Sequence, residues 1–153
     1  MIKSPAVKPS ATHNKVAEAA TAPVRIGILG LGTVGCGTVN VLARNREEIA
    51  RRAGRRIEVA QAAARDPSKA RGCITQHIAI RRAEEVVRDP DIEIVVELIG
   101  GYEPARTLVL DAIAHGKHVV TANKALIALH GNEIFRAAQE RGVMVAFEAA
   151  VAG

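Results

Sequence analysis

The chain has 153 residues, of which 48% are hydrophobic and 24% are charged, and this is enough apolar material for the core of one soluble domain. No apolar run approaches the roughly 20 residues that a membrane-spanning helix needs, so we expect no membrane partner. The formal net charge is +5, but one Tyr, two Phe and no Trp leave few rings to stack on bases, which disfavours a nucleic-acid partner. Arginines occur in pairs at 51–52, 55–56 and 81–82, and these pairs are better explained as solvated helix ends.

Residues 1–22 are rich in Ala, Pro, Ser, Thr and Lys and lack the sustained apolar core of a signal peptide. A basic, acid-poor start can imitate a transit peptide, but a disordered tail is the favoured interpretation. From Pro23 onward the pattern changes, and we expect a single domain over 23–153.

Short apolar runs in this domain alternate with segments of helical periodicity. The alternation predicts an α/β fold, a Rossmann-type doubly wound and mainly parallel sheet with helices on both faces. The expected strands cover about 24–29, 57–64, 77–80, 92–99, 118–121 and 143–147. The expected helices cover about 33–53, 83–88, 104–116, 124–129 and 132–141.

The two cysteines, Cys36 and Cys73, lie far apart and form no CxxC motif. We therefore expect neither a disulfide framework nor a zinc site. This cysteine usage fits a reducing, cytoplasmic location.

The segments that follow the strands carry the functional signal, because ligands bind outside the carboxyl ends of the strands in an open α/β sheet. These segments read GLGTVG, RDPSK, GGYEP, TANK and EAAVAG. Parallel strands would place all five along one edge. A structural sheet needs turns there, but it does not need Arg65, Lys124 and Glu148 on the same rim.

The first of these segments fits GxGxxG directly after a strand and at a helix start, which predicts dinucleotide binding. The first glycine permits a tight turn, the second leaves room for a pyrophosphate, and the third lets helix and strand pack closely. Backbone N–H groups and the helix dipole then hold the phosphates. The alternative is a glycine-rich turn needed only for packing. The motif comprises Gly30, Leu31, Gly32, Thr33, Val34 and Gly35.

The end of the second strand should select the cofactor. Arg65 comes first and Lys69 follows closely, which favours the extra phosphate of NADP(H), while Asp66 keeps NAD(H) open. Thirty residues separate Gly35 from Arg65, more than is usual, and the charged segment 44–56 accounts for a longer helix. The alternative for Arg65 is a solvated charge after a strand.

Four segments together resemble the amino-terminal NAD(P)-binding domain of homoserine dehydrogenase: ILGLGTVGCGTV, ARDPSKARG, the stretch from VVELIGGYEP to TANKALIALHGNEIF, and VAFEAAVAG. The resemblance runs from about Val24 to Gly153, and ELIGG, TANK and FEAAVAG are its most specific parts. It implies an oxidoreductase that reduces L-aspartate 4-semialdehyde to L-homoserine with NADPH or NADH, on the route to threonine and methionine.

The resemblance also implies roles for single residues. Leu31 to Val34 would contact the cofactor pyrophosphate, and Arg65, with Lys69 close behind, would meet the adenosine ribose phosphate. Ile99 and Gly100 would lie beside the cofactor.

The final segment resembles the family's sodium site. Glu148 would give a side-chain oxygen, and Val151 and Gly153 would give backbone carbonyls. An all-oxygen site suits a hard cation. The alternative for Glu148 is a carboxylate that is hydrogen-bonded to loop amides.

In the family, the lysine of TANK, here Lys124, reaches the nicotinamide and the substrate. Hydride addition to an aldehyde leaves negative charge on oxygen, and a nearby cation or proton donor stabilises that transition state. A lysine that is partly desolvated at a helix start would have a lowered pKa and could give up a proton, and the sequence leaves open whether Lys124 donates a proton or only positions the substrate. The alternative for Lys124 is an exposed residue of the helix start.

The match stops at Gly153, where the family continues into a substrate and dimerisation domain that carries its main catalytic lysine. We therefore expect a truncated chain that binds nucleotide without turnover, and a homodimer when the chain has its full length. Two alternatives stay open: a non-catalytic nucleotide-binding module, and another dehydrogenase with the same cofactor fold.

Overall fold

The computed structural model describes residues 22–66, 68, 73 and 77–147. The expected tail, apart from Ala22, lies outside the described residues. So do four predicted site residues, which are Lys69, Glu148, Val151 and Gly153.

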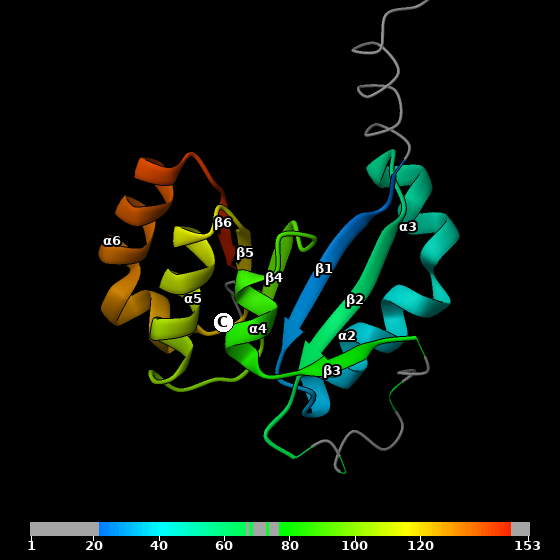
Figure 1. Ribbon diagram of the computed structural model, residues 1–153, viewed down its shortest axis with the longest axis horizontal. Coiled ribbons are helices and arrows are strands. Elements are labelled where there is room, and N and C mark those ends of the chain that lie inside the picture. The colour runs from blue at the N-terminus through cyan, green and yellow to red at the C-terminus, as the bar shows by residue number, and fades with distance from the viewer. Residues whose placement is uncertain (1–21, 67, 69–72, 74–76, 148–153) are drawn as a thin grey trace, which may run out of the picture.

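The core element is a six-stranded sheet in which every strand pairs parallel with its neighbours, in the order β3-β2-β1-β4-β5-β6 (Figure 1). This confirms the predicted fold class. The strands are β1 (Val24–Leu29), β2 (Ile57–Ala63), β3 (Ala79–Arg81), β4 (Ile94–Glu97), β5 (His118–Thr121) and β6 (Val145–Phe147).

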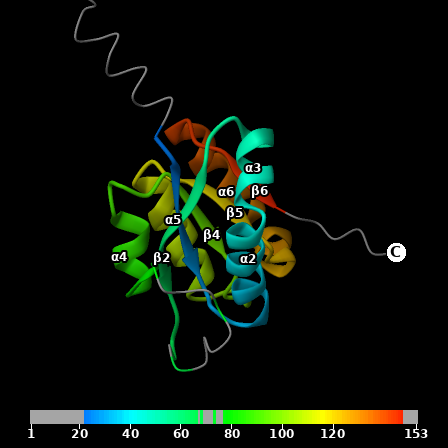
Figure 2. The same cartoon turned by 90° about the vertical axis from the view of Figure 1, so that its right-hand side faces the viewer.

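Helices cover both faces of the sheet (Figure 2). The first pair lies on one face, and the other three lie on the opposite face. The helices are α2 (Thr33–Arg44), α3 (Arg46–Ala53), α4 (Ala83–Arg88), α5 (Ala105–Ala114) and α6 (Lys124–Arg141).

Adjacent residues on one strand serve two separate cores, because side chains alternate between the faces of a strand. Ile28 packs with Val39 of α2, whereas Leu29 packs with the apolar side chains of α4, α5 and α6. Both side chains are fully buried. The nearly continuous apolar sequence of β1 follows from this double burial.

The last residues of the six strands stand in register across the sheet. Leu29 pairs with both Ala63 and Glu97, and Glu97 pairs in turn with Thr121. The row continues to Arg81 at one edge and to Phe147 at the other. The loops that follow all six strands therefore leave the sheet from one line.

Two helix boundaries differ from the sequence prediction. The helix expected over 33–53 is two helices, because Asn45 leaves the helical conformation and its side-chain amide donates to the carbonyl oxygen of Val41 at 3.1 Å. Conversely, the two helices expected on either side of Gly131 are one continuous helix, α6. Glycine inside a helix costs about 1 kcal/mol but does not end it, and burial of Ile134 and Ala138 beyond it offsets that cost.

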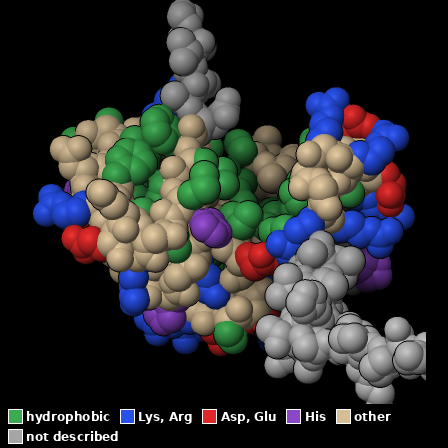
Figure 3. Space-filling view, turned by 90° about the horizontal axis from the view of Figure 1, so that it is seen from above, with side chains coloured by type: hydrophobic (Ala, Val, Ile, Leu, Met, Phe, Trp, Pro, Cys, Tyr) green, Lys and Arg blue, Asp and Glu red, His purple; other side chains and the backbone are tan. Residues whose placement is uncertain are grey.

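The charged helix α3 contains one of the three pairs of arginines, Arg51 and Arg52. Arg51 and Arg52 both form ion pairs with Glu48, and both arginine side chains are more than three-quarters exposed. Basic and acidic side chains are interspersed at this end of the molecule (Figure 3). This confirms the interpretation of these arginines as a solvated helix end. Among the described residues, no helix is long and apolar enough to cross a membrane.

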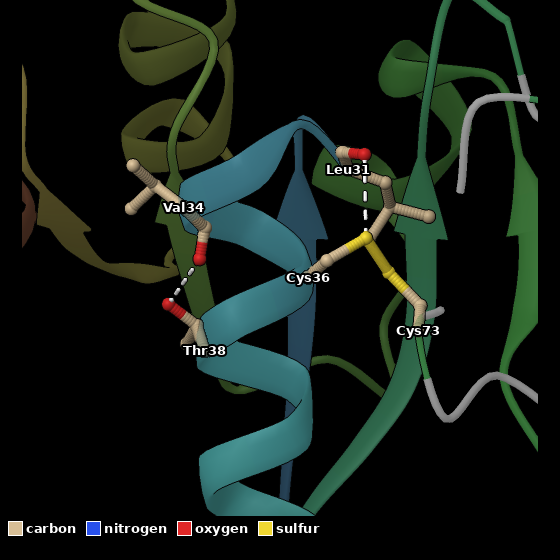
Figure 4. Close-up of a disulfide and its surroundings, with 5 residues drawn as sticks. All are labelled: Leu31, Val34, Cys36, Thr38 and Cys73. Atoms are coloured by element: carbon tan, nitrogen blue, oxygen red, sulfur yellow. Dashed lines mark hydrogen bonds between the residues drawn. A yellow bond between two sulfur atoms is a disulfide. The ribbon is translucent and has the colours of Figure 1, made fainter. Parts of the chain in front are cut away.

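The expectation of no disulfide is wrong. Cys36 and Cys73 form a disulfide with a Cα–Cα distance of 4.9 Å (Figure 4). They are 37 positions apart in sequence, but Cys36 lies in the first turn of α2 and Cys73 lies in the loop after the neighbouring strand β2. Both pack against the core that contains Ile28 and Ala62. The argument for a reducing compartment from cysteine usage therefore no longer holds.

Cys73→Ser should lower the free energy of unfolding by about 2–4 kcal/mol, because the cross-link restricts a long loop of the unfolded chain. Urea denaturation of the oxidised chain and the variant measures the difference. Reductant should reproduce the loss in the parent chain and add nothing in Cys73→Ser. Two free thiols in the denatured, unreduced parent chain would contradict the disulfide.

Candidate functional site

The turn between β1 and α2 contains two glycines that packing requires. Gly30 has a φ of 101°, in the left-handed region, and a Cβ there would lie 2.7 Å from the carbonyl oxygen of Leu98. A Cβ on Gly35 would overlap the carbonyl oxygen of Gly30. Close backbone packing alone therefore explains the first and third glycines of the motif.

Gly32 is different, because packing does not require a glycine there. A Cβ at Gly32 would meet nothing within 4 Å, and its φ of −77° suits any residue. It is the N-cap of α2, where no side-chain cap hydrogen bond forms and no acidic residue lies in the first turn. The first-turn N–H groups and the positive end of the helix dipole suit an anion that approaches the backbone closely.

The end of β2 carries the two side chains that bear on cofactor choice, and both are exposed. Asp66 is engaged locally, since its Oδ1 accepts hydrogen bonds from the backbone N–H of Ser68 at 3.0 Å and from the Ser68 hydroxyl at 2.6 Å. Arg65 stands one residue beyond Ala64, which packs on the core beneath α2. The N–H of Gly30 donates to Ala63, so this strand end lies directly beside the glycine turn.

The loop after β4 is organised by Glu97, a residue that the sequence reasoning missed. Its side chain is fully buried. Oε1 accepts from the backbone N–H of Ile99 at 2.8 Å and of Gly100 at 3.1 Å, and Oε2 accepts from the Thr121 hydroxyl at 2.5 Å. An acidic residue inside the apolar run IEIVVELI is the signal that could have identified it, because a buried carboxylate needs hydrogen-bond partners.

The TANK segment joins the same site through Asn123. Its Oδ1 accepts from the N–H of Leu126 at 3.1 Å and caps α6, while its Nδ2 donates to the carbonyl oxygen of Gly101 at 2.5 Å. Lys124 is therefore the first residue of α6 and lies next to the loop after β4. Its side chain is exposed, which agrees with the alternative of an exposed residue at the helix start.

The structure thus brings three predicted segments together. The glycine turn lies beside the loop after β4, since the N–H of Leu98 donates at 2.8 Å to the carbonyl oxygen of Leu29, the residue just before the turn. That loop contacts the TANK segment through Gly101. Arg65 is placed on the far side of the glycine turn, beyond β2. The predicted sodium ligands lie outside the described residues.

A lysine at the opposite end of β5 serves a structural purpose. Lys117 is almost fully buried, and burial lowers its pKa from the usual value. Its Nζ donates to the carbonyl oxygen of Asp89 at 2.5 Å. Lys117 precedes β5 and Lys124 follows it, so only Lys124 lies at the edge where the strands end.

Comparison with known proteins decides the family. Residues 30–148 match the model of the homoserine dehydrogenase NAD-binding domain. The chain belongs to this family. The match includes the glycine turn, Glu97 and the TANK segment.

Homoserine dehydrogenases of known sequence and structure align over the same region. That of Pseudomonas aeruginosa is 66% identical over 132 residues, which are 86% of this chain and 30% of the relative. That of Neisseria gonorrhoeae is 50% identical over 131 residues, again 86% and 30%. A homoserine dehydrogenase structure from Thiobacillus denitrificans has a TM-score of 0.82 at 62% identity, with 87% of this chain and 31% of that one covered. The chain thus spans about 30% of the length of these relatives.

The glycine geometry predicts a large loss of stability for one of two matched substitutions and a small loss for the other. Gly35→Ala should lower the free energy of unfolding by about 3 kcal/mol or more, because its methyl group collides with backbone. Gly32→Ala should cost about 1 kcal/mol or less, the difference between glycine and alanine at an N-cap. Urea denaturation measures both. Equal losses would show that packing requires both glycines.

Proposed function

We propose that this chain is the nicotinamide-dinucleotide-binding part of a homoserine dehydrogenase. The reaction is the NAD(P)H-dependent reduction of L-aspartate 4-semialdehyde to L-homoserine, in threonine and methionine biosynthesis. The observation that carries the proposal is the open space around Gly32. Neither packing nor backbone conformation requires a glycine at this position. Family membership and the ligand-binding edge of a parallel sheet support it.

In this proposal the pyrophosphate lies against the backbone from Leu31 to Val34, at the start of α2. The N–H groups there and the helix dipole favour its negative charge. The adenosine half extends toward Arg65 on one side, and the nicotinamide half extends toward Ile99, Gly100 and Lys124 on the other. This direction follows from the order β2-β1-β4-β5 of the neighbouring strands.

The chemistry that we assign to Lys124 is electrostatic. When hydride adds to the aldehyde carbon, negative charge develops on the carbonyl oxygen, and an ammonium near that oxygen stabilises the transition state more than the ground state. The exposed position of Lys124 at the functional edge leaves it accessible to both cofactor and substrate. For residues 1–153 by themselves, we propose cofactor binding without turnover, because the relatives are about three times longer.

Two further assignments rest on the resemblance. A monovalent cation, sodium, would bind Glu148, Val151 and Gly153, which lie outside the described residues. A homodimer at the full length of the relatives is supported by large apolar side chains that are exposed in this structure, among them Val41, Met144 and Phe147.

We assign NADP(H) as the preferred cofactor because the carboxylate of Asp66 is engaged by Ser68, whereas Arg65 is exposed beside it. An arginine at this position accommodates the 2′-phosphate that distinguishes NADPH from NADH.

Gly32→Ala should weaken NADPH binding by about tenfold or more, because its methyl group occupies the space through which the pyrophosphate approaches. Isothermal titration calorimetry of the chain with NADPH measures the change in affinity. Gly37→Ala is the matched control, since it adds a methyl group to the same helix in open space. Unchanged affinity in Gly32→Ala would contradict the proposed pyrophosphate position.

Arg65→Ala should weaken NADPH binding by roughly 10- to 100-fold, the contribution of hydrogen bonds to a charged group, and should change NADH binding by less than about threefold. The same calorimetric titration with both cofactors measures the ratio. Arg56→Ala provides a control for the loss of one positive charge at the other end of β2. Equal affinity for both cofactors in the parent chain, unchanged in Arg65→Ala, would overturn the NADP assignment.

A further inference from the structure

A closed ring of hydrogen bonds connects the loop after β4 to the start of α6. The Thr121 hydroxyl donates to Glu97 and accepts from the N–H of Asn123 at 3.0 Å. The Asn123 side-chain amide donates to the carbonyl oxygen of Gly101, and the N–H of Gly100 donates to Glu97, which closes the ring. Two loops that are far apart in sequence are thereby held as one unit.

The ring is costly, and packing alone does not require it. Glu97 and Thr121 are fully buried, and Asn123 is 8% exposed. A buried carboxylate is less favourable than an apolar side chain of similar size unless its hydrogen bonds are complete. The other inward-facing residue of β4, Val95, is apolar and equally buried, so the sheet itself tolerates an apolar residue.

We propose that Glu97 is a positioning residue for the nicotinamide end of the site. One carboxylate oxygen fixes the loop of Ile99 and Gly100, and the other fixes Thr121 and, through it, the helix start that carries Lys124. The buried carboxylate therefore sets the distance between the cofactor loop and the Lys124 amine. The inference rests on the proposed function, which places the nicotinamide half of the cofactor between these two elements.

A consequence of this arrangement is energetic coupling. If one carboxylate aligns both elements, the contribution of Lys124 to cofactor affinity depends on an intact link between Glu97 and Thr121. Residues in one hydrogen-bond network show such non-additivity, whereas independent sites do not.

Thr121→Val tests the link, since it removes the hydroxyl, keeps the shape and leaves the bonds from Glu97 to Ile99 and Gly100 in place. We expect NADPH to bind about tenfold more weakly, because a buried carboxylate oxygen and the Asn123 N–H lose their partner. Thr121→Ser restores the hydroxyl and should bind within about threefold of the parent chain. Lys117→Met is the matched control, since it removes a buried hydrogen bond at the opposite end of β5 and should leave NADPH affinity unchanged.

The decisive measurement is a double-mutant cycle with Lys124→Ala. In the parent chain this substitution should weaken NADPH binding by about tenfold, and in Thr121→Val it should add less than about twofold. Calorimetry at a temperature where all four proteins are folded measures the cycle. Additive effects would show that the ring does not position Lys124 and would overturn the proposal.

Failure of the proposed function is distinguishable from failure of this inference. If the parent chain binds neither NADPH nor NADH, the proposed function fails. Amide hydrogen exchange of the unliganded chain then measures how well the ring protects its backbone N–H groups. Thr121→Val should accelerate exchange at Leu126, whose N–H donates to the Asn123 side chain, whereas Lys117→Met should not. Unchanged exchange at Leu126 in Thr121→Val would overturn the positioning role of the ring.

Discussion

The register of the parallel sheet is the constraint on which the rest of the structure depends. Leu29, Glu97 and Thr121 end their strands side by side, so the segments that follow them begin on one line. Had β5 shifted by one residue, Thr121 would face the opposite side of the sheet and could not reach Glu97. The glycine turn, the loop after β4 and the TANK segment meet because three strands end together.

The same register separates two tasks along each strand. The middle of each central strand is apolar and buried against helices on both faces, which supplies the stability of the domain. Its last residue and the loop beyond it carry the polar groups that can meet a ligand. Glu97 belongs to both parts, since it is buried like the core and hydrogen-bonded like the edge. This dual position explains why an acidic residue ends an apolar strand.

Much of the fold could be predicted from local patterns. The strands at 24–29 and 118–121 have the predicted bounds, because each is a short apolar run that ends at a turn signal, and the helix at 83–88 also has its predicted bounds although its pattern is weak. The break at Asn45 and the continuity of α6 through Gly131 were missed, because both depend on a balance of about 1 kcal/mol between capping, burial and propensity. The disulfide was missed for another reason, since the pairing of Cys36 with Cys73 depends on α2 lying beside the loop after β2.

The sequence by itself determined the α/β class, the glycine motif at the start of a helix, and the presence of Arg65 and Lys124 after strands. These are local features, and elementary rules of chain conformation suffice to identify them. Only the tertiary structure decided that Gly32 is a glycine without a packing reason, that Ser68 engages Asp66, and that Glu97 links two loops. The first and the third depend on distances between atoms of different segments, and no spacing along one chain encodes such distances. The contact between Asp66 and Ser68 is local, and it depends on the conformation of both side chains.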